Sequence, residues 1–276
     1  MTGTIQATTP LEELKAKQHQ IWSNGDYGKI AWVTVPLAER LCDAVELRPG
    51  SSVLDVACGT GHVAIEAART FCDVTGIDYV AELVETARRR AAAEGLSIAF
   101  EVADAESLPF AEGSFDRVLS AIGVMFTADH DRAAAELVRV CRPGGTIGIA
   151  SWTAEGFIGR LLKTVGAHVP APPVALPPTR WGNEDVVREL LGEEVVDVTS
   201  STHVVTQRFT SAEAFADFML TYYGPTYTAA RRLDESGRAA FRADLVALAL
   251  DAGQIIDDTF AADWEYRVVT ATRRTS

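Results

Sequence analysis

The sequence has few basic residues for its length. Its 276 residues include 25 Lys and Arg against 38 Asp and Glu, which gives a formal net charge of −13. A chain this acidic has no general attraction for phosphate backbones, and this argues against nucleic acid as a partner. An ordinary soluble surface accounts for the excess of negative charge.

Cysteines and long apolar runs are also scarce. No apolar run approaches the roughly 20 residues that a membrane-spanning helix needs, and the N-terminal stretch MTGTIQATTP lacks the layout of a signal peptide. We therefore expect a cytoplasmic protein with no membrane partner. We also expect free thiols and no bound metal, because the cysteines lie in apolar segments without CxxC spacing. The four are Cys42, Cys58, Cys72 and Cys141.

Apolar residues are plentiful, at 47% of the chain, which is enough for one substantial core. Between residues 45 and 152, short apolar runs alternate with amphipathic helical stretches. The runs SSVLDVA, DVTGID, SIAFEVAD, FDRVLSAIGVMF and TIGIASW predict strands. This alternation predicts an α/β fold with a mostly parallel sheet covered by helices on both faces.

An acid stands beside a glycine-rich turn in residues 53–61, VLDVACGTG. Gly59 and Gly61 allow the backbone to approach a ligand, but dinucleotide-binding proteins share that pattern. The carboxylate of Asp55 would repel a phosphate, so it favours a ligand that carries a cationic group. Asp55 could alternatively organise the turn without touching a ligand.

Two further acids follow the next two strands. Ligands of such sheets bind at the carboxyl ends of the strands. There, Asp78 can accept hydrogen bonds from both hydroxyls of a ribose. Asp104 can accept one from an adenine amine beside the Ala105 backbone, although it could also be a plain cap of its strand. Together these acids predict a nucleoside with a cationic tail and no phosphates.

Four segments carry a family resemblance: VLDVACGTGHVA, VTGIDYV, VADAESLPFAEGSFDRVLSAIGVMF and ELVRVCRPGGTIGIASW. In this order they resemble the class I S-adenosylmethionine-dependent methyltransferases, in the small-molecule branch similar to ubiquinone/menaquinone C-methyltransferases. The resemblance implies S-adenosyl-L-methionine as cofactor and S-adenosyl-L-homocysteine as product. The cofactor contacts that it implies are Asp55, Ala57, Gly59, Gly61, Asp78, Tyr79, Asp104, Ala105, Ser120 and Ile122.

The resemblance also implies a Rossmann-like, seven-stranded sheet whose last strand is antiparallel. We expect an N-terminal helical segment over the cofactor site, a cofactor-binding core, and a helical lid inserted before the last strand. An apolar helical face in that insertion serves equally well as a dimer interface, so monomer and homodimer both stay open. The expected bounds are 1–45 for the N-terminal segment, 46–209 with 256–276 for the core, and 210–255 for the lid.

Methyl transfer from a sulfonium is an in-line displacement that needs aligned reactants and at most one base. His130, on the loop after the fourth predicted strand, and Tyr27, in the N-terminal segment, are the candidate catalytic residues. His130 could instead be a capping or surface histidine, and Tyr27 could only pack. Alignment of the reactants without any base is a further alternative.

Aromatic residues near loops and the predicted lid suggest an apolar slot for a flat or lipophilic acceptor, although each could also be a core residue. We expect methyl transfer to the oxygen, nitrogen or carbon of a small acceptor in secondary metabolism. The alternative is an enzyme of the same fold that catalyses a non-methylating step such as cyclisation. The predicted acceptor residues are Trp22, Tyr27, Trp152, Phe157, Trp181, Phe218, Tyr222 and Tyr223.

Overall fold

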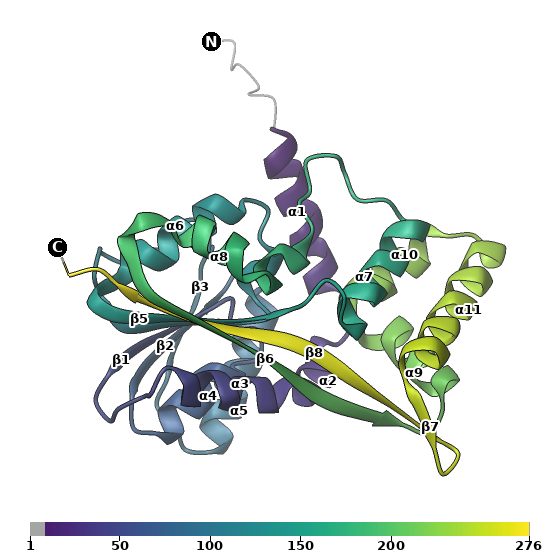
Figure 1. Ribbon diagram of the computed structural model, residues 1–276, viewed down its shortest axis with the longest axis horizontal. Helices are drawn as coiled ribbons and strands as arrows, with labels where there is room; N and C mark the ends of the chain where they lie inside the picture. The colour runs from purple at the N-terminus through teal and green to yellow at the C-terminus, as the bar shows by residue number, and fades with distance from the viewer. Residues whose placement is uncertain (1–8, 276) are drawn as a thin grey trace.

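The computed structural model describes residues 9–275, which form one mixed sheet with helices around it (Figure 1). The strand order is β3-β2-β1-β4-β5-β8-β6, with a short β7 paired to β8. The strands are β1 (Ser52–Val56), β2 (Asp73–Asp78), β3 (Ala99–Val102), β4 (Phe115–Ala121), β5 (Cys141–Trp152), β6 (Val195–Phe209), β7 (Gln254–Ile256) and β8 (Thr259–Arg273).

The first five strands are parallel to one another, whereas β8 runs antiparallel to β5, β6 and β7. The predicted Rossmann-like fold, with seven principal strands and an antiparallel last one, is therefore confirmed, and β7 is a small addition. The predicted fourth strand was too long at its end. Strand β4 ends at Ala121 because Ile122 has a φ of 54° and Val124–Phe126 form a short 3₁₀ turn, η2.

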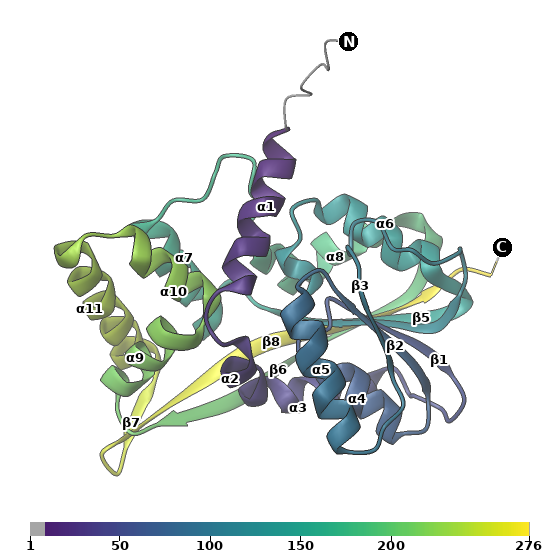
Figure 2. The same cartoon turned by 180° about the vertical axis from the view of Figure 1, so that it is seen from behind.

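Helices cover both faces of the sheet, as the alternation predicted (Figures 1 and 2). Side-chain caps start two of them: Asp129 accepts a hydrogen bond from the Arg132 amide at 3.0 Å, and Asn183 accepts one from the Asp185 amide at 2.9 Å. One face carries α3 (Val35–Ala44), α4 (His62–Arg69) and α5 (Ala81–Ala93), and the other carries α6 (His130–Val140) and α8 (Glu184–Leu191).

The remaining helices gather beyond the carboxyl ends of the parallel strands, where the long β6–β8 ribbon extends past the sheet (Figure 1). Helix α1 packs beside α10, and the loop after α1 meets α9 through a hydrogen bond from the Asp26 amide to the Tyr222 carbonyl. These elements are α1 (Pro10–Ser23), α2 (Tyr27–Ala31), η1 (Trp32–Thr34), α7 (Phe157–His168), α9 (Ala212–Tyr222), α10 (Gly224–Arg232) and α11 (Glu235–Ala252), with η3 (Pro178–Gly182) and η4 (Gly192–Glu194) near α8.

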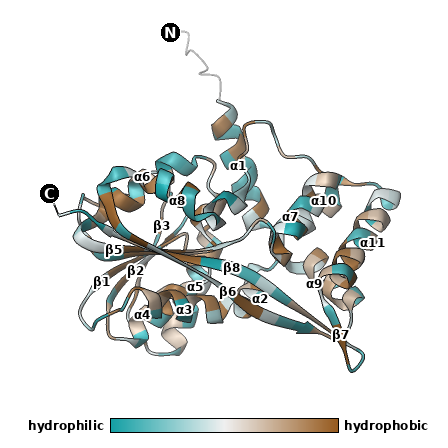
Figure 3. Ribbon diagram, viewed as in Figure 1, coloured by the Kyte–Doolittle hydropathy of each residue, from teal (hydrophilic) through white to brown (hydrophobic). Residues whose placement is uncertain are grey.

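Hydrophobic residues concentrate along the central strands and the helix faces that cover them (Figure 3). The inserted helices α9–α11 share this core. The ring of Phe215 on α9 lies 5.2 Å from Phe157, 5.4 Å from Phe209 and 5.6 Å from Phe260, measured between centroids. Aromatic packing therefore joins the insertion to α7, β6 and β8.

The structure can be compared with the predictions about cysteines and membrane-spanning helices. All four cysteines lie within residues 9–275, and all four are unpaired. No helix in that range is long and apolar enough to cross a membrane. Residues 1–8 of the expected N-terminal segment lie outside the described residues.

Candidate functional site

A cavity opens at the carboxyl ends of β1 to β4, beneath α1, and is called here the strand-end cavity. The space at these strand ends measures about 620 Å³ when its open mouth is counted. Residues from four strand ends and from α1 line it, so segments distant in sequence meet there. The predicted cofactor residues among them are Ala57, Gly59, Asp78, Tyr79, Asp104, Ala105 and Ile122.

Asp78 is held rigidly in the wall of this cavity. It is 5% exposed, and its two carboxylate oxygens accept hydrogen bonds from the Gly59 and Val80 amides, each at 2.9 Å. Burial raises its pKa to about 6, while those backbone hydrogen bonds act in the opposite direction. Each oxygen keeps a lone pair free, so the carboxylate can still accept hydrogen bonds from a ligand.

Two residues at the strand ends have a strained backbone. Ala57 follows β1 with a φ of 55°, and Ile122 follows β4 with a φ of 54°. A branched residue at positive φ is a true outlier, and such strain persists only where the surroundings hold it. Ser120 is part of those surroundings, since its hydroxyl donates to the Val56 carbonyl at 2.8 Å and accepts from the Val124 amide at 3.1 Å. Ser120 thus shapes the turn but does not line the cavity.

Two other predicted contacts also lie outside the strand-end cavity. Asp55 accepts a hydrogen bond from the Ala64 amide at 2.9 Å and lines a smaller neighbouring cavity, called here the Asp55 cavity. Burial raises its pKa to about 7. Gly61 lines neither cavity. With a φ of 81°, it gives room to Ala87 and Phe100, which an added Cβ would approach to 3.0 and 3.1 Å.

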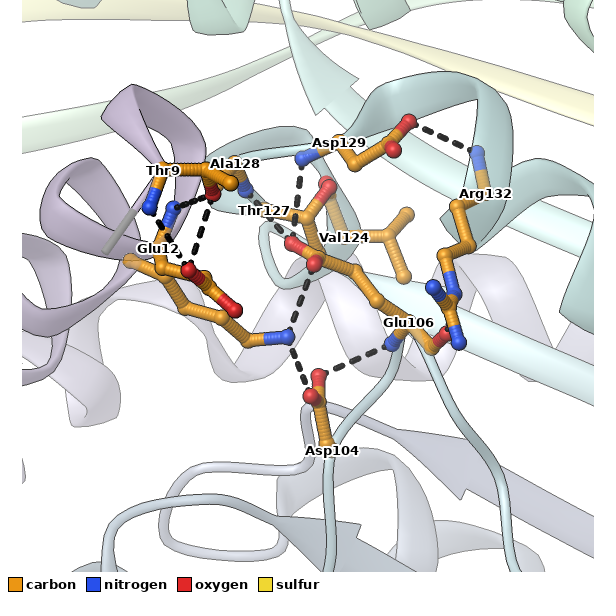
Figure 4. Close-up of polar contacts among 10 residues, drawn as sticks. Thr9, Glu12, Asp104, Glu106, Val124, Thr127, Ala128, Asp129 and Arg132 are labelled. Atoms are coloured by element: carbon orange, nitrogen blue, oxygen red, sulfur yellow. Dashed lines mark hydrogen bonds and ion pairs between the residues drawn. The ribbon is translucent and has the colours of Figure 1, made fainter. Parts of the chain in front are cut away.

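A lysine from α1 closes one side of the strand-end cavity. Lys15 forms ion pairs with Asp104 and, at 2.7 Å, with Glu106. The buried carboxylate of Glu106 also accepts hydrogen bonds from the Ala128 and Asp129 amides at 2.7 and 3.0 Å (Figure 4). Sequence reasoning missed Lys15 and Glu106. In the sequence, the only sign of Glu106 is that it is a second acid two residues after Asp104. Nothing local points to Lys15, because it lies 89 residues away from Asp104.

This contact predicts how α1 is attached. Replacing Lys15 with alanine is expected to speed amide hydrogen exchange across α1 several-fold, because two carboxylates lose their shared cation while the core is untouched. Hydrogen exchange read by mass spectrometry measures this. Lys17, exposed on the same helix, supplies the control variant Lys17→Ala. Equal exchange in the two variants would show that the ion pairs do not hold α1.

A third, mostly apolar cavity lies deeper and is called here the inner cavity. It is narrow, and it shares Trp22, Tyr27 and Ile122 with the strand-end cavity. Four predicted acceptor residues lie in its wall, and Trp264 on β8 joins them without having been predicted. The lining residues are Trp22, Tyr27, Ile30, Thr34, Ile122, Trp152, Ile158, Met219, Tyr223 and Trp264.

The other four predicted acceptor residues are not brought to this cavity. Phe157 packs in the aromatic cluster around Phe215. Phe218 and Tyr222 pack on each other, with ring centroids 5.1 Å apart, and Phe218 also faces Trp32. Trp181 is fully buried and packs against the ring of His130.

His130 is likewise absent from both the strand-end and inner cavities. It begins α6 rather than lying on a loop, because Asp129 caps the helix, and its ring is buried against Trp181. Burial and the charge of Arg180 lower its pKa. The structure thus gives His130 no access to a ligand there, contrary to its expected place facing the acceptor.

Tyr27 lies where the three cavities meet. Its ring packs under the glycine turn, where an added Cβ on Gly59 would come within 3.2 Å of it. Burial, followed by the charge of Asp78, raises the pKa of Tyr27 well above its usual range. The phenol therefore stays protonated at neutral pH and can donate a hydrogen bond, but it is a poor base. The nearby His62 has both ring nitrogens engaged, by Ala31 at 2.6 Å and Arg90 at 2.5 Å.

Comparison with known proteins identifies a domain in the first half of the chain. Residues 53–145 match a family model described as a methyltransferase domain. A ubiquinone/menaquinone biosynthesis C-methyltransferase, UbiE of Geotalea daltonii, is 38% identical over 119 residues, which cover 41% of this chain and 51% of that protein. Residues 53–145 therefore carry a methyltransferase domain, in line with the resemblance to class I S-adenosylmethionine-dependent methyltransferases.

Similarity over nearly the whole length comes from a different relative. An uncharacterized protein of Mycobacterium tuberculosis is 41% identical over 272 residues, covering 96% of this chain and 98% of that protein. Among solved structures, the [4+2]-cyclase SpnF superposes with a TM-score of 0.57 at 24% identity, over 88% of this chain and 82% of that one. At this identity the structural likeness shows the fold alone.

Proposed function

We propose that this protein transfers a methyl group from S-adenosyl-L-methionine to the oxygen, nitrogen or carbon of a small aromatic or lipophilic acceptor. The observation that carries the proposal is the junction of two unlike cavities. The strand-end cavity, with the fixed carboxylate of Asp78, meets the apolar inner cavity at Trp22, Tyr27 and Ile122. A polar cofactor and an apolar acceptor would therefore adjoin at these residues.

The residues of the strand-end cavity fit the cofactor. Asp78 can accept hydrogen bonds from the ribose hydroxyls, and Asp104 with Ala105 can meet the adenine once Lys15 yields or shares the carboxylate. Tyr79 lines the same cavity, and Ala57 and Gly59 would form the turn for the methionyl part. Asp55, in the adjoining Asp55 cavity, is our candidate for the amino group. Gly61 and Ser120 would act only through the shape of these turns.

The chain's own part in the reaction would be mainly alignment. The cofactor supplies a methyl group on a positively charged sulfur, and the inner cavity would hold the acceptor in line with it and away from water. Tyr27 would orient the acceptor as a hydrogen-bond donor. No histidine lines either the strand-end or the inner cavity within residues 9–275. We propose that the acceptor's proton leaves to solvent through the open mouth of the adjoining strand-end cavity.

We propose that the insertion at residues 210–255 carries acceptor specificity. It supplies Met219 and Tyr223 to the wall of the inner cavity, whereas Phe218 and Tyr222 lie outside it. Helices α1 and α2 would cover the cofactor. Helix α3, the rest of the expected N-terminal segment, packs against the sheet and would only support them.

The test is incubation with a methyl-labelled cofactor and a panel of phenols, amines and aromatic ketones. Label in an acceptor, recovered by chromatography, supports the proposal. Cofactor-dependent conversion of an acceptor without label would favour the cyclisation alternative. Neither label nor conversion in any acceptor, from protein that binds S-adenosyl-L-homocysteine, would contradict both.

A further inference from the structure

Three charged side chains meet in one wall of the strand-end cavity, and only one of them is a cation. Lys15 on α1 pairs with Asp104 and Glu106, which follow β3. Among the described residues, Lys15 is the only cation within ion-pair distance of either carboxylate. Burial lowers the pKa of Lys15, but hydrogen bonds to the two carboxylates outweigh that effect and raise it overall, so the ammonium group is charged at neutral pH. One lysine thus serves two acids.

The two acids are held in unlike ways. The Glu106 side chain is 7% exposed, and its Oε1 accepts hydrogen bonds from the amides of Ala128 and Asp129, in the loop before α6 (Figure 4). Its Oε2 accepts one from Lys15 at 2.7 Å. The Asp104 side chain, in contrast, is 35% exposed. Glu106 is therefore a fixed anchor for the ammonium group, and Asp104 is the acid that a ligand can reach.

Both oxygens of Asp104 are engaged. Oδ1 accepts a hydrogen bond from the Glu106 amide at 2.9 Å, and Oδ2 pairs with Lys15. A carboxylate has no proton to donate, so a ligand that binds it must bring a donor of its own. Under the proposed function that donor is the exocyclic amine of adenine, which is neutral. It would meet an oxygen already held by a cation, and the attraction between opposite charges favours the lysine.

We propose that Lys15 competes with the adenine amine of the cofactor for Asp104, and that binding shifts the ammonium group onto Glu106 alone. This inference rests on the proposed function, because it needs adenine at the carboxylate. The cofactor would then bind against an ion pair, and Lys15 would lower the cofactor's affinity. A lysine that only fastened α1 over the cavity would have the opposite effect, because its loss would loosen the cover. The sign of the change in affinity separates the two roles.

The test is calorimetric titration of S-adenosyl-L-homocysteine into wild type and Lys15→Met. The variant keeps an apolar stem of similar length and removes the charge. It is expected to bind about fivefold more tightly, since Asp104 is then free to accept from the amine. In the Asp104→Asn background, the same change at Lys15 is expected to alter the affinity by less than about twofold, because the contested carboxylate is gone. Lys17→Met, which removes an exposed charge from the same helix, is the control and should leave the affinity unchanged.

Salt gives a second readout that needs no variant. Raising the salt from about 50 to about 500 mM screens the ion pair, so the wild-type affinity is expected to rise and that of Lys15→Met to stay level. A wild-type affinity that does not rise with salt would overturn the inference. So would binding by Lys15→Met that is no tighter than by wild type, or an equal gain in the Asp104→Asn background.

Label transfer to an acceptor is measured separately, so that the inference and the proposed function can fail independently. If label is transferred but Lys15→Met binds no tighter, the inference alone fails. If Lys15→Met binds more tightly but no acceptor is labelled, the inference stands and the proposed methyl transfer fails. Absence of S-adenosyl-L-homocysteine binding by every form would contradict both.

Discussion

Replacing Asp78 with alanine is expected to weaken binding of S-adenosyl-L-homocysteine at least tenfold and to change thermal stability little. The substitution would leave the ribose hydroxyls without their acceptor, at about 1–3 kcal/mol for each buried group. Stability should hold because the lost hydrogen bonds to the Gly59 and Val80 amides are offset by removal of a buried carboxylate, whose raised pKa reports an unfavourable charge.

Calorimetry with Asp78→Ala measures this, and Asp73→Ala at the exposed start of the same strand is the control. An unaltered dissociation constant for Asp78→Ala would count decisively against the assignment.

The pH dependence of cofactor affinity tests the same assignment. The pKa of Asp78 is about 6, so protonation below that pH removes acceptor sites and affinity should fall as the pH drops from 7 to 5. Asp78→Asn should lack this fall. A fall that persists in that variant belongs to another group.

Replacing Phe215 with alanine is expected to lower the free energy of unfolding by about 3–5 kcal/mol, the usual cost of removing a buried aromatic ring. Phe215 is fully buried and joins the inserted helices to Phe157, Phe209 and Phe260. The lost ring leaves a cavity among rigid neighbours that cannot collapse into it.

Chemical denaturation measures this effect, and Leu250→Ala on α11 is the control, because Leu250 is 57% exposed and should cost little. We expect one cooperative transition in the wild type and in both variants, since aromatic contacts make the insertion part of the common core. Two separate transitions, with only the weaker one shifted in Phe215→Ala, would instead make residues 210–255 an independent folding unit.

Most of the strand-end cavity was predictable from the sequence because one rule places it. The carboxyl ends of parallel strands meet at one edge, so Asp78 and Asp104 must converge with the glycine turn that follows β1. That rule locates residues but not the direction of their side chains. Ser120 and Gly61 lie at the predicted turns but do not line the cavity. The Ser120 hydroxyl donates to the Val56 carbonyl instead, and Gly61 gives room to Ala87 and Phe100.

The acceptor side was less predictable because its walls come from distant elements. Trp264 looks like an ordinary residue of an alternating strand, and only the meeting of β8 with α2 and the α9–α10 junction places it in a cavity. The prediction that His130 lies on a loop failed for a local reason. A cap at Asp129 begins the helix there, and this turns the histidine ring toward Trp181 instead of toward a loop surface.

Helix α1 contributes to both ligand spaces at once. Lys15 closes the strand-end cavity, and Trp22, two turns further along the same face, lies in the walls of both cavities. Under the proposed function, the spent cofactor and the methylated product would then leave through one movement of this helix. Their dissociation rates would be linked, and a mutation that slows the opening of α1 would lengthen the residence time of both.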